Sequence, residues 1–173
     1  MIITKGVQRM RILGIDPGIA TVGYGVIDYI DDELLLVDYG TITTPPDLKM
    51  PERLDIIYRE MLCLLDSFRP DHIAFEELFF AKNVKTAISV AHARGVLLTS
   101  AYQYTKELYE YTPLQVKQAI VGYGRAEKRQ IQQMVKTMLH LEDIPRPDDA
   151  ADACAIAITH AMSMKLTGIF KIL

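Results

Sequence analysis

Cysteine is scarce in this chain: there are two, Cys63 and Cys154, and no CxxC pair. Each lies alone in an apolar segment, so we expect both to be core residues of a protein from a reducing compartment. No run of 18 residues is free of charged side chains, which argues against a membrane-spanning helix. The first residues, MIITKGVQRM, contain neither the apolar region nor the cleavage site of a signal peptide, so we expect a cytoplasmic protein.

Internal repeats and low-complexity segments are also missing. A chain of 173 residues is long enough for one domain with a proper core. We expect that domain to span residues 10–164. Residues 1–9 match no element and are expected to form an N-terminal extension, and residues 165–173 form a short tail to which we assign no role.

Positive charge is unevenly distributed. The net charge is −3, yet the segment Lys82 to Arg129 holds eight Lys or Arg and three Glu, a net of +5 that leaves −8 elsewhere. A basic middle in an acidic chain is the local footprint expected of a polyanion-binding surface. A mixed, solvated surface would explain any single one of these charges equally well.

Apolar periodicity predicts an α/β fold with a mixed, five-stranded sheet flanked by helices. The predicted strands cover residues 12–16, 22–27, 33–43, 72–76 and 106–111. The predicted helices cover residues 51–68, 84–100, 113–120, 127–139 and 149–164. The first three strands have short connections and suggest an antiparallel meander, whereas the helix before the fourth makes it a crossover strand parallel to the first.

Four acids stand at the ends of these elements. Asp16 ends the first strand, Glu76 ends the fourth, and Asp149 and Asp152 share one face of the first turn of the last helix, which Asp148 would cap. Parallel neighbouring strands would bring Asp16 and Glu76 to one edge of the sheet, where open α/β sheets place their sites. Each acid also has a plainer interpretation, as a turn cap, a solvated loop residue or a partner of the helix dipole.

A set of four carboxylates without His or Cys suits hard divalent cations such as Mg²⁺ or Mn²⁺. Two such ions can clamp the attacking and leaving oxygens of a phosphodiester. The spacing therefore favours a metal-dependent phosphodiesterase, provided that the four acids converge.

Five segments of this sequence resemble the RuvC family of Holliday-junction resolvases. They are ILGIDPGIATVGYGVI (12–27), FEELFFAKN (75–83), ARGVL (93–97), QVKQAIVGYGRAEK (115–128) and DDAADACAIAITH (148–160). The resemblance implies a ribonuclease-H-like fold, a homodimer and metal-dependent cleavage of four-way junction DNA in recombination and repair. It also implies cooperation with a branch-migration motor complex.

Carried onto this chain, the acidic tetrad of the family falls on Asp16, Glu76, Asp149 and Asp152, each with its carboxylate in place. The junction-probing aromatic falls on Phe79. The family's basic DNA contacts fall on Lys117 and Lys128. The positive segment offers further candidate phosphate contacts: Lys82, Lys85, Arg94, Arg125 and Arg129.

The hypothesis is a crossover junction endodeoxyribonuclease that makes paired symmetric nicks and leaves 5′-phosphate and 3′-hydroxyl ends. The tetrad would bind two Mg²⁺ ions, for which Mn²⁺ would substitute. We expect the small-residue helix around residues 87–96 to form the dimer interface, and Gly18, Gly23 and Gly25 to let the first hairpin run close beneath DNA.

Three alternatives stay open at this point. The chain would be a non-catalytic junction-binding module if the tetrad held no metal, or a ribonuclease-H-like nuclease acting on another nucleic acid. The segment DPGIATVGYGV is also similar to the phosphate loop of actin-like ATPases, although those proteins need two such domains.

Overall fold

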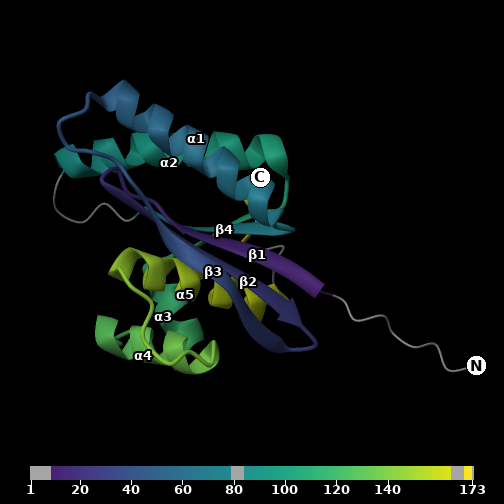
Figure 1. Cartoon of the computed structure of the whole chain (residues 1–173). Helices are drawn as coiled ribbons and strands as arrows, with labels where there is room; N and C mark the ends of the chain where they lie inside the picture. The colour runs from purple at the N-terminus through teal and green to yellow at the C-terminus, as the bar shows by residue number, and fades with distance from the viewer. Residues whose placement is uncertain (1–8, 79–83, 165–169, 173) are drawn as a thin grey trace, which may run out of the picture.

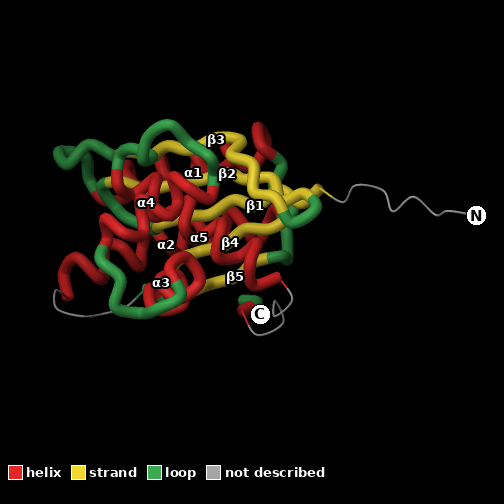
Figure 2. Tube along the Cα trace, turned by 90° about the horizontal axis from the view of Figure 1, so that it is seen from below, coloured by secondary structure: helices red, strands yellow, loops and turns green. Residues whose placement is uncertain are grey.

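A five-stranded mixed sheet forms the centre of the protein, in the strand order β3-β2-β1-β4-β5 (Figures 1 and 2). The computed structural model describes residues 9–78, 84–164 and 170–172, without the side chains of residues 84–86. The strands are β1 (Arg9–Asp16), β2 (Thr21–Ile30), β3 (Glu33–Thr43), β4 (His72–Glu76) and β5 (Leu108–Tyr111). As predicted, β1, β2 and β3 form an antiparallel meander, and β4 runs parallel to β1.

Two layers of helices cover the sheet. The helices are α1 (Met50–Phe68), α2 (Val84–Tyr104), α3 (Pro113–Val121), α4 (Lys128–Met138) and α5 (Asp148–Ser163). Figure 1 shows α1 and α2 on one face of the sheet, and α3, α4 and α5 on the other. The predicted α/β fold with flanking helices is confirmed.

The side chains of β1 alternate between the two faces of the sheet. Leu13 and Ile15 are fully buried in the core beneath α1 and α2. Ile12 is buried in the second core, beneath α3, α4 and α5. Because successive strand side chains point to opposite faces, Gly14 and Asp16 lie on the same face as Ile12. Asp16 therefore faces α5.

Helix α5 packs directly onto the strand backbones, since eleven of its residues are buried and most of them are alanine. A Cβ on Gly14 would approach the backbone of Ala157 to 2.7 Å, and one on Gly25 would approach the Cys154 nitrogen to 2.8 Å. These distances are shorter than real Cβ contacts, so the close helix requires glycine here. Gly23 and Gly25 thus make room for α5, and the expectation that they make room for DNA is wrong.

Three local expectations fail. Helix α5 begins at Asp148 and its N-cap is Pro147, so Asp148 does not cap it and Asp152 lies beyond the first turn. Cys154 is buried as expected, but Cys63 is exposed because α1 turns Ile57, Met61 and Leu65 to the core instead.

The end of the chain packs against β5. The backbone nitrogen of Ile172 donates to Leu108, and the Phe170 ring lies 4.9 Å from that of Tyr111. The Lys171 ammonium lies 2.7 Å from the Glu107 carboxylate. Residues 170–172 therefore extend the folded unit beyond the expected boundary at residue 164, just as β1 begins at Arg9 rather than Met10.

Among the helices of the described residues, none is both long enough and apolar enough to cross a membrane.

Candidate active site

Asp16 and Glu76 stand side by side at the carboxyl ends of two parallel strands. Ile15 of β1 pairs with Phe75 of β4, and the two acids are the next residue on each strand. Both lie on the α5 face, because Ala74, two residues before Glu76, belongs to the core beneath that helix. The sheet thus places two of the four predicted acids at one edge.

The first two turns of α5 bring Asp149 and Asp152 to the same edge. Gly23 is the register partner of Asp16 in the β1–β2 ladder, and the Asp149 backbone oxygen lies where a Cβ on Gly23 would stand. Because Gly23 has no side chain, the start of α5 can lie beside Asp16. Three separate elements contribute to one acidic cluster, as the sequence predicts.

The electrostatics of the cluster reflect this crowding. Burial, reinforced by the charges of Glu76, Asp152 and Asp149, raises the pKa of Asp16 to about 8. Burial and the Asp152 carboxylate also raise the pKa of Glu76, and burial raises that of Asp152. When neighbouring carboxylates raise the pKa of a carboxyl group, a nearby cation stabilises its ionised form.

Lys128 supplies one cation to this cluster. Its ammonium, at the start of α4, lies 2.9 Å from an oxygen of Asp152 and 3.5 Å from an oxygen of Asp148. Partial burial lowers the pKa of Lys128, but the hydrogen bond to Asp152 and both carboxylate charges outweigh it and raise that pKa overall.

Asp148 is a fifth carboxylate that sequence reasoning assigned to helix capping. The Gln132 amide donates a hydrogen bond to it at 2.9 Å. That bond, with the Lys128 charge, lowers the pKa of Asp148. The contacts of Lys128 and Gln132 with Asp148 join α4 to the start of α5. The four-residue spacing of Lys128 and Gln132 on one helix face is the only signal in the sequence that would have suggested this pairing.

A pocket of about 250 Å³ opens between these groups. Its polar lining consists of Glu76 and Asp152 together with Lys117 of α3 and Lys128 of α4. A site that presents carboxylates beside ammonium groups has the means to hold a cation and a phosphate together.

The donor set fits a divalent metal ion. All four side chains are oxygen donors. Burial and neighbouring carboxylates raise the pKa values of Asp16, Glu76 and Asp152, and a divalent cation would relieve that repulsion. In the part of the chain that the structure describes, however, no three Asp, Glu, His or Cys side chains converge closely enough to count as a ready-made metal cage. The four acids lie near enough for their charges to interact. The side chain in contact with Asp152 is Lys128 rather than another acid. Mg²⁺ commonly keeps several waters and uses few direct protein ligands, so a closed cage is not required.

The other predicted DNA contacts are placed differently. Lys117 lines the pocket and makes no ion pair with any described residue, and Arg125 and Arg129 are exposed near the start of α4. Arg94 instead points into the protein, where its guanidinium pairs with Glu110 at 2.5 Å and keeps only 19% of its side chain exposed. Phe79 and Lys82 lie outside the described residues, as does the side chain of Lys85.

Comparison with known proteins gives a consistent picture. The family model described as crossover junction endodeoxyribonuclease RuvC matches residues 12–160. A protein of that name from Alkaliphilus oremlandii is 58% identical over 163 residues, which cover 94% of this chain and 99% of the relative.

Two solved structures agree in fold and in length. The structure of Thermus thermophilus RuvC matches with a TM-score of 0.85 at 37% identity, covering 95% of this chain and all of that one. The same protein in complex with a Holliday junction substrate matches with a TM-score of 0.84 at 36% identity, covering 95% of this chain and 99% of that chain.

Proposed function

Because this chain belongs to the RuvC family of crossover junction endodeoxyribonucleases, we propose that Asp16, Glu76, Asp149 and Asp152 form its catalytic centre. The protein is a metal-dependent nuclease that resolves Holliday junctions in recombination and repair. The single observation that carries the proposal is the convergence of the four acids from β1, β4 and α5 on one edge of the sheet.

The cofactor proposed for this centre is Mg²⁺, two ions per site, with Mn²⁺ as a substitute. When bound, such ions neutralise charge on a phosphodiester and make water a better nucleophile near neutral pH. Asp16 lies between Glu76 on the neighbouring strand and Asp149 on α5, so it would contribute to metal binding on both sides of the site. The products would be a 5′-phosphate and a 3′-hydroxyl.

The basic residues would hold the junction over this centre. Lys117 and Lys128 line the pocket with Glu76 and Asp152, so their ammonium groups would contact phosphates next to the scissile one. Arg125 and Arg129 would contact the backbone further out. Phe79, three residues beyond Glu76, would insert into an unstacked base step. Arg94 is committed to Glu110, and we do not extend the proposal to it.

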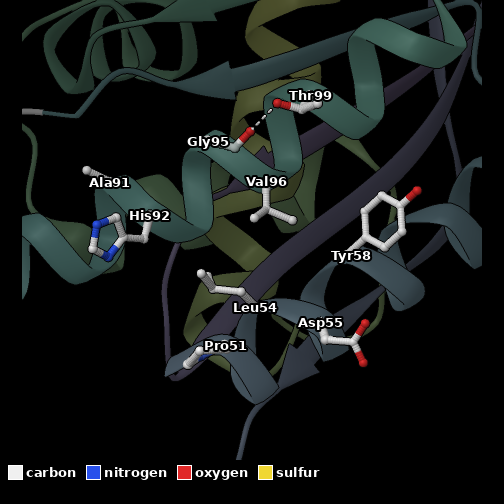
Figure 3. A pocket seen from close by; sticks show the side chains of 9 residues that line it. All are labelled: Pro51, Leu54, Asp55, Tyr58, Ala91, His92, Gly95, Val96 and Thr99. Carbon is white, nitrogen blue, oxygen red and sulfur yellow. Dashed lines mark hydrogen bonds between the residues drawn. The ribbon is translucent and has the colours of Figure 1, made fainter. Parts of the chain in front are cut away.

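A homodimer would supply the second cut, because two symmetric nicks need two equivalent sites. The proposed interface is the groove of about 730 Å³ between α1 and α2, on the face opposite the acidic cluster (Figures 1 and 3). Figure 3 shows Leu54 and Tyr58 of α1 facing Gly95 and Val96 of α2. Tyr58 in the groove is 38% exposed. Leu62, one turn further along α1, is 38% exposed, and Ile88, one turn before Ala91 on α2, is 53% exposed, which is apolar area that a second copy would cover.

We further propose that the dimer works in the cytoplasm with a branch-migration motor complex.

The decisive experiment incubates the protein with a synthetic four-way junction and Mg²⁺ and maps the cuts at nucleotide resolution. We expect paired nicks at symmetric positions, no cutting without divalent metal, and no cutting by Asp16→Asn although that variant still shifts the junction in a gel. Full cleavage by Asp16→Asn would overturn the assigned centre. A bandshift without nicks would identify a binding module, and equal cutting of linear duplex or RNA–DNA hybrid would identify a nuclease with another substrate.

A further inference from the structure

Lys128 touches a carboxylate that the proposed metal needs. Its ammonium lies 2.9 Å from Asp152 and accounts for the one ion pair that Asp152 makes among the described residues. Lys128 is still 53% exposed, on the first turn of α4, and its long side chain has several rotatable bonds. An ammonium in this position occupies an Asp152 oxygen that the proposed divalent cation would need.

Asp148, the second carboxylate within reach of Lys128, lies in a different environment from Asp152. Asp148 is 50% exposed, lies 3.5 Å from the Lys128 ammonium and does not line the pocket that Glu76 and Asp152 share. The Gln132 amide, one turn along α4 from Lys128, holds its other oxygen at 2.9 Å. Asp148 is therefore an anchored anion beside the pocket, and it is not one of the four acids proposed to hold the metal.

From this geometry we propose that Lys128 competes with the divalent cation for Asp152, and that Asp148 receives its ammonium when the cation binds. The inference rests on the proposed metal site and adds a regulating residue to it. Asp148 lowers the cost of moving Lys128 away from Asp152, because the ammonium already lies 3.5 Å from Asp148 and can close on that carboxylate as it leaves. In the DNA complex the same release would free Lys128 for a phosphate.

Matched variants separate competition from a general effect of charge. Lys128→Met removes the competitor, and Lys128→Arg keeps a cation in its place. Lys117→Met removes a cation that lines the same pocket and makes no ion pair with any residue described by the structure, so it measures the through-space effect alone. Asp148→Asn removes the receiving carboxylate, alone and together with Lys128→Met.

The measurement is a Mn²⁺ titration of the full-length protein without DNA, followed by electron paramagnetic resonance of the free ion and repeated with Mg²⁺ as competitor. We expect Lys128→Met to bind Mn²⁺ about two- to fivefold more tightly, the range over which exposed ion pairs act. Lys117→Met should change the affinity by less than half of that, and Lys128→Arg should stay near wild type. Asp148→Asn should weaken binding, but only while Lys128 is present.

Unchanged or weaker Mn²⁺ binding by Lys128→Met overturns the inference. So does an equal effect of Asp148→Asn in both backgrounds, because that result would reflect charge alone. Junction cleavage is assayed with the same preparations. If the wild type cleaves while the Lys128 variants bind Mn²⁺ like wild type, only the competition fails. If wild type neither binds Mn²⁺ nor cleaves, the metal site and the competition fail together.

Discussion

The backbone oxygen of Asp149 lies where a Cβ on Gly23 would have to stand. Gly23 is also the register partner of Asp16, so one missing side chain determines how closely α5 approaches the acid at the end of β1. Two members of the tetrad thus depend on a residue that has no side chain and takes no part in chemistry.

Gly23→Ala should therefore separate Asp149 from Asp16. We expect a loss of about 1–3 kcal/mol in the free energy of unfolding, typical of an overpacked core. Cleavage should fall further, by roughly 100-fold, since a shift of about 1 Å at a site costs that much. Denaturant unfolding and junction cleavage rates would be measured on the same preparation.

Gly95→Ala is the matched control for the unfolding measurement alone, because Gly95 lines the proposed dimer groove and a Cβ there could affect cleavage through assembly. A Cβ at Gly95 would meet no atom within 4 Å, and the residue lies inside helix α2. We expect it to be neutral or to stabilise the chain by about 0.5–1 kcal/mol. If Gly23→Ala behaved as mildly as Gly95→Ala, close packing of α5 would not be what positions Asp149.

Asp16 should make stability fall as pH rises. Its pKa is raised from the ordinary value of 3.8 to about 8, so between these values the folded chain holds a proton that the unfolded chain releases. This contribution to stability is complete below about pH 4 and is lost as the pH approaches 8. In EDTA, Asp16→Asn should therefore stabilise the protein by ~2 kcal/mol or more at pH 8 and by little at pH 4.

The control for that experiment is saturating Mg²⁺, which should shrink the difference because a bound cation offsets the repulsion. Unfolding free energies of the two proteins that differ equally at every pH would show that Asp16 is not the group that titrates.

His160 should make stability fall as the pH decreases, over a lower pH range than Asp16. Its ring is fully buried, with Nδ1 2.8 Å from the Tyr111 hydroxyl and Nε2 2.8 Å from Nδ1 of His72. The Tyr109 ring lies 4.2 Å from the His160 ring, tilted by 34°, and the charge of Glu107 favours the protonated form of His160. Burial, then the His72 charge, lowers the pKa of His160 from 6.5 to about 3.

Below pH 6.5 the unfolded chain therefore binds a proton at His160 that the folded chain does not bind. The stability from His160 is complete above pH 6.5 and should fall by about 2 kcal/mol by pH 5. Urea unfolding across this range should show a shallower pH dependence in His160→Asn, although that variant is less stable at neutral pH. An unchanged slope would assign the acid sensitivity to other groups.

Much of this arrangement follows from the sequence. Alternating apolar residues predicted β1 and its neighbours, and a helix between two strands predicted that Asp16 and Glu76 end at one edge. The role of the glycines could not be predicted, because the sequence GYG does not indicate which helix packs on that strand. The Lys128–Asp152 pair joins residues 24 positions apart on separate helices, whose relative placement depends on core packing. Asp148 was misassigned because an acid before a helix resembles a cap, and here Pro147 takes that position.

The α1–α2 groove leads to a test of assembly. Ile88→Glu would place a charge on the exposed apolar surface of α2, and we expect sedimentation as a 19.5 kDa monomer where the wild type sediments at twice that mass. Leu114→Glu introduces the same charge at an equally exposed leucine on α3, on the other side of the sheet, and should leave the dimer intact. Dissociation by both substitutions, or by neither, would place the interface elsewhere.

The contrast between Arg125 and Arg94 tests which basic residues meet DNA. Arg125 is exposed three residues before Lys128, a residue that lines the pocket, so Arg125→Gln should weaken junction binding and reduce the slope of log affinity against log salt by about 0.9. Arg94→Gln removes a guanidinium that is paired with Glu110 and mostly buried, so it should lower stability by ~1–3 kcal/mol and leave that slope unchanged. Arg59→Gln, an exposed arginine on α1, is the control and should alter neither quantity by much. Both quantities come from fluorescence anisotropy over a salt series and from denaturant unfolding. A reduced salt slope in Arg94→Gln would mean that its ion pair with Glu110 opens to admit a phosphate.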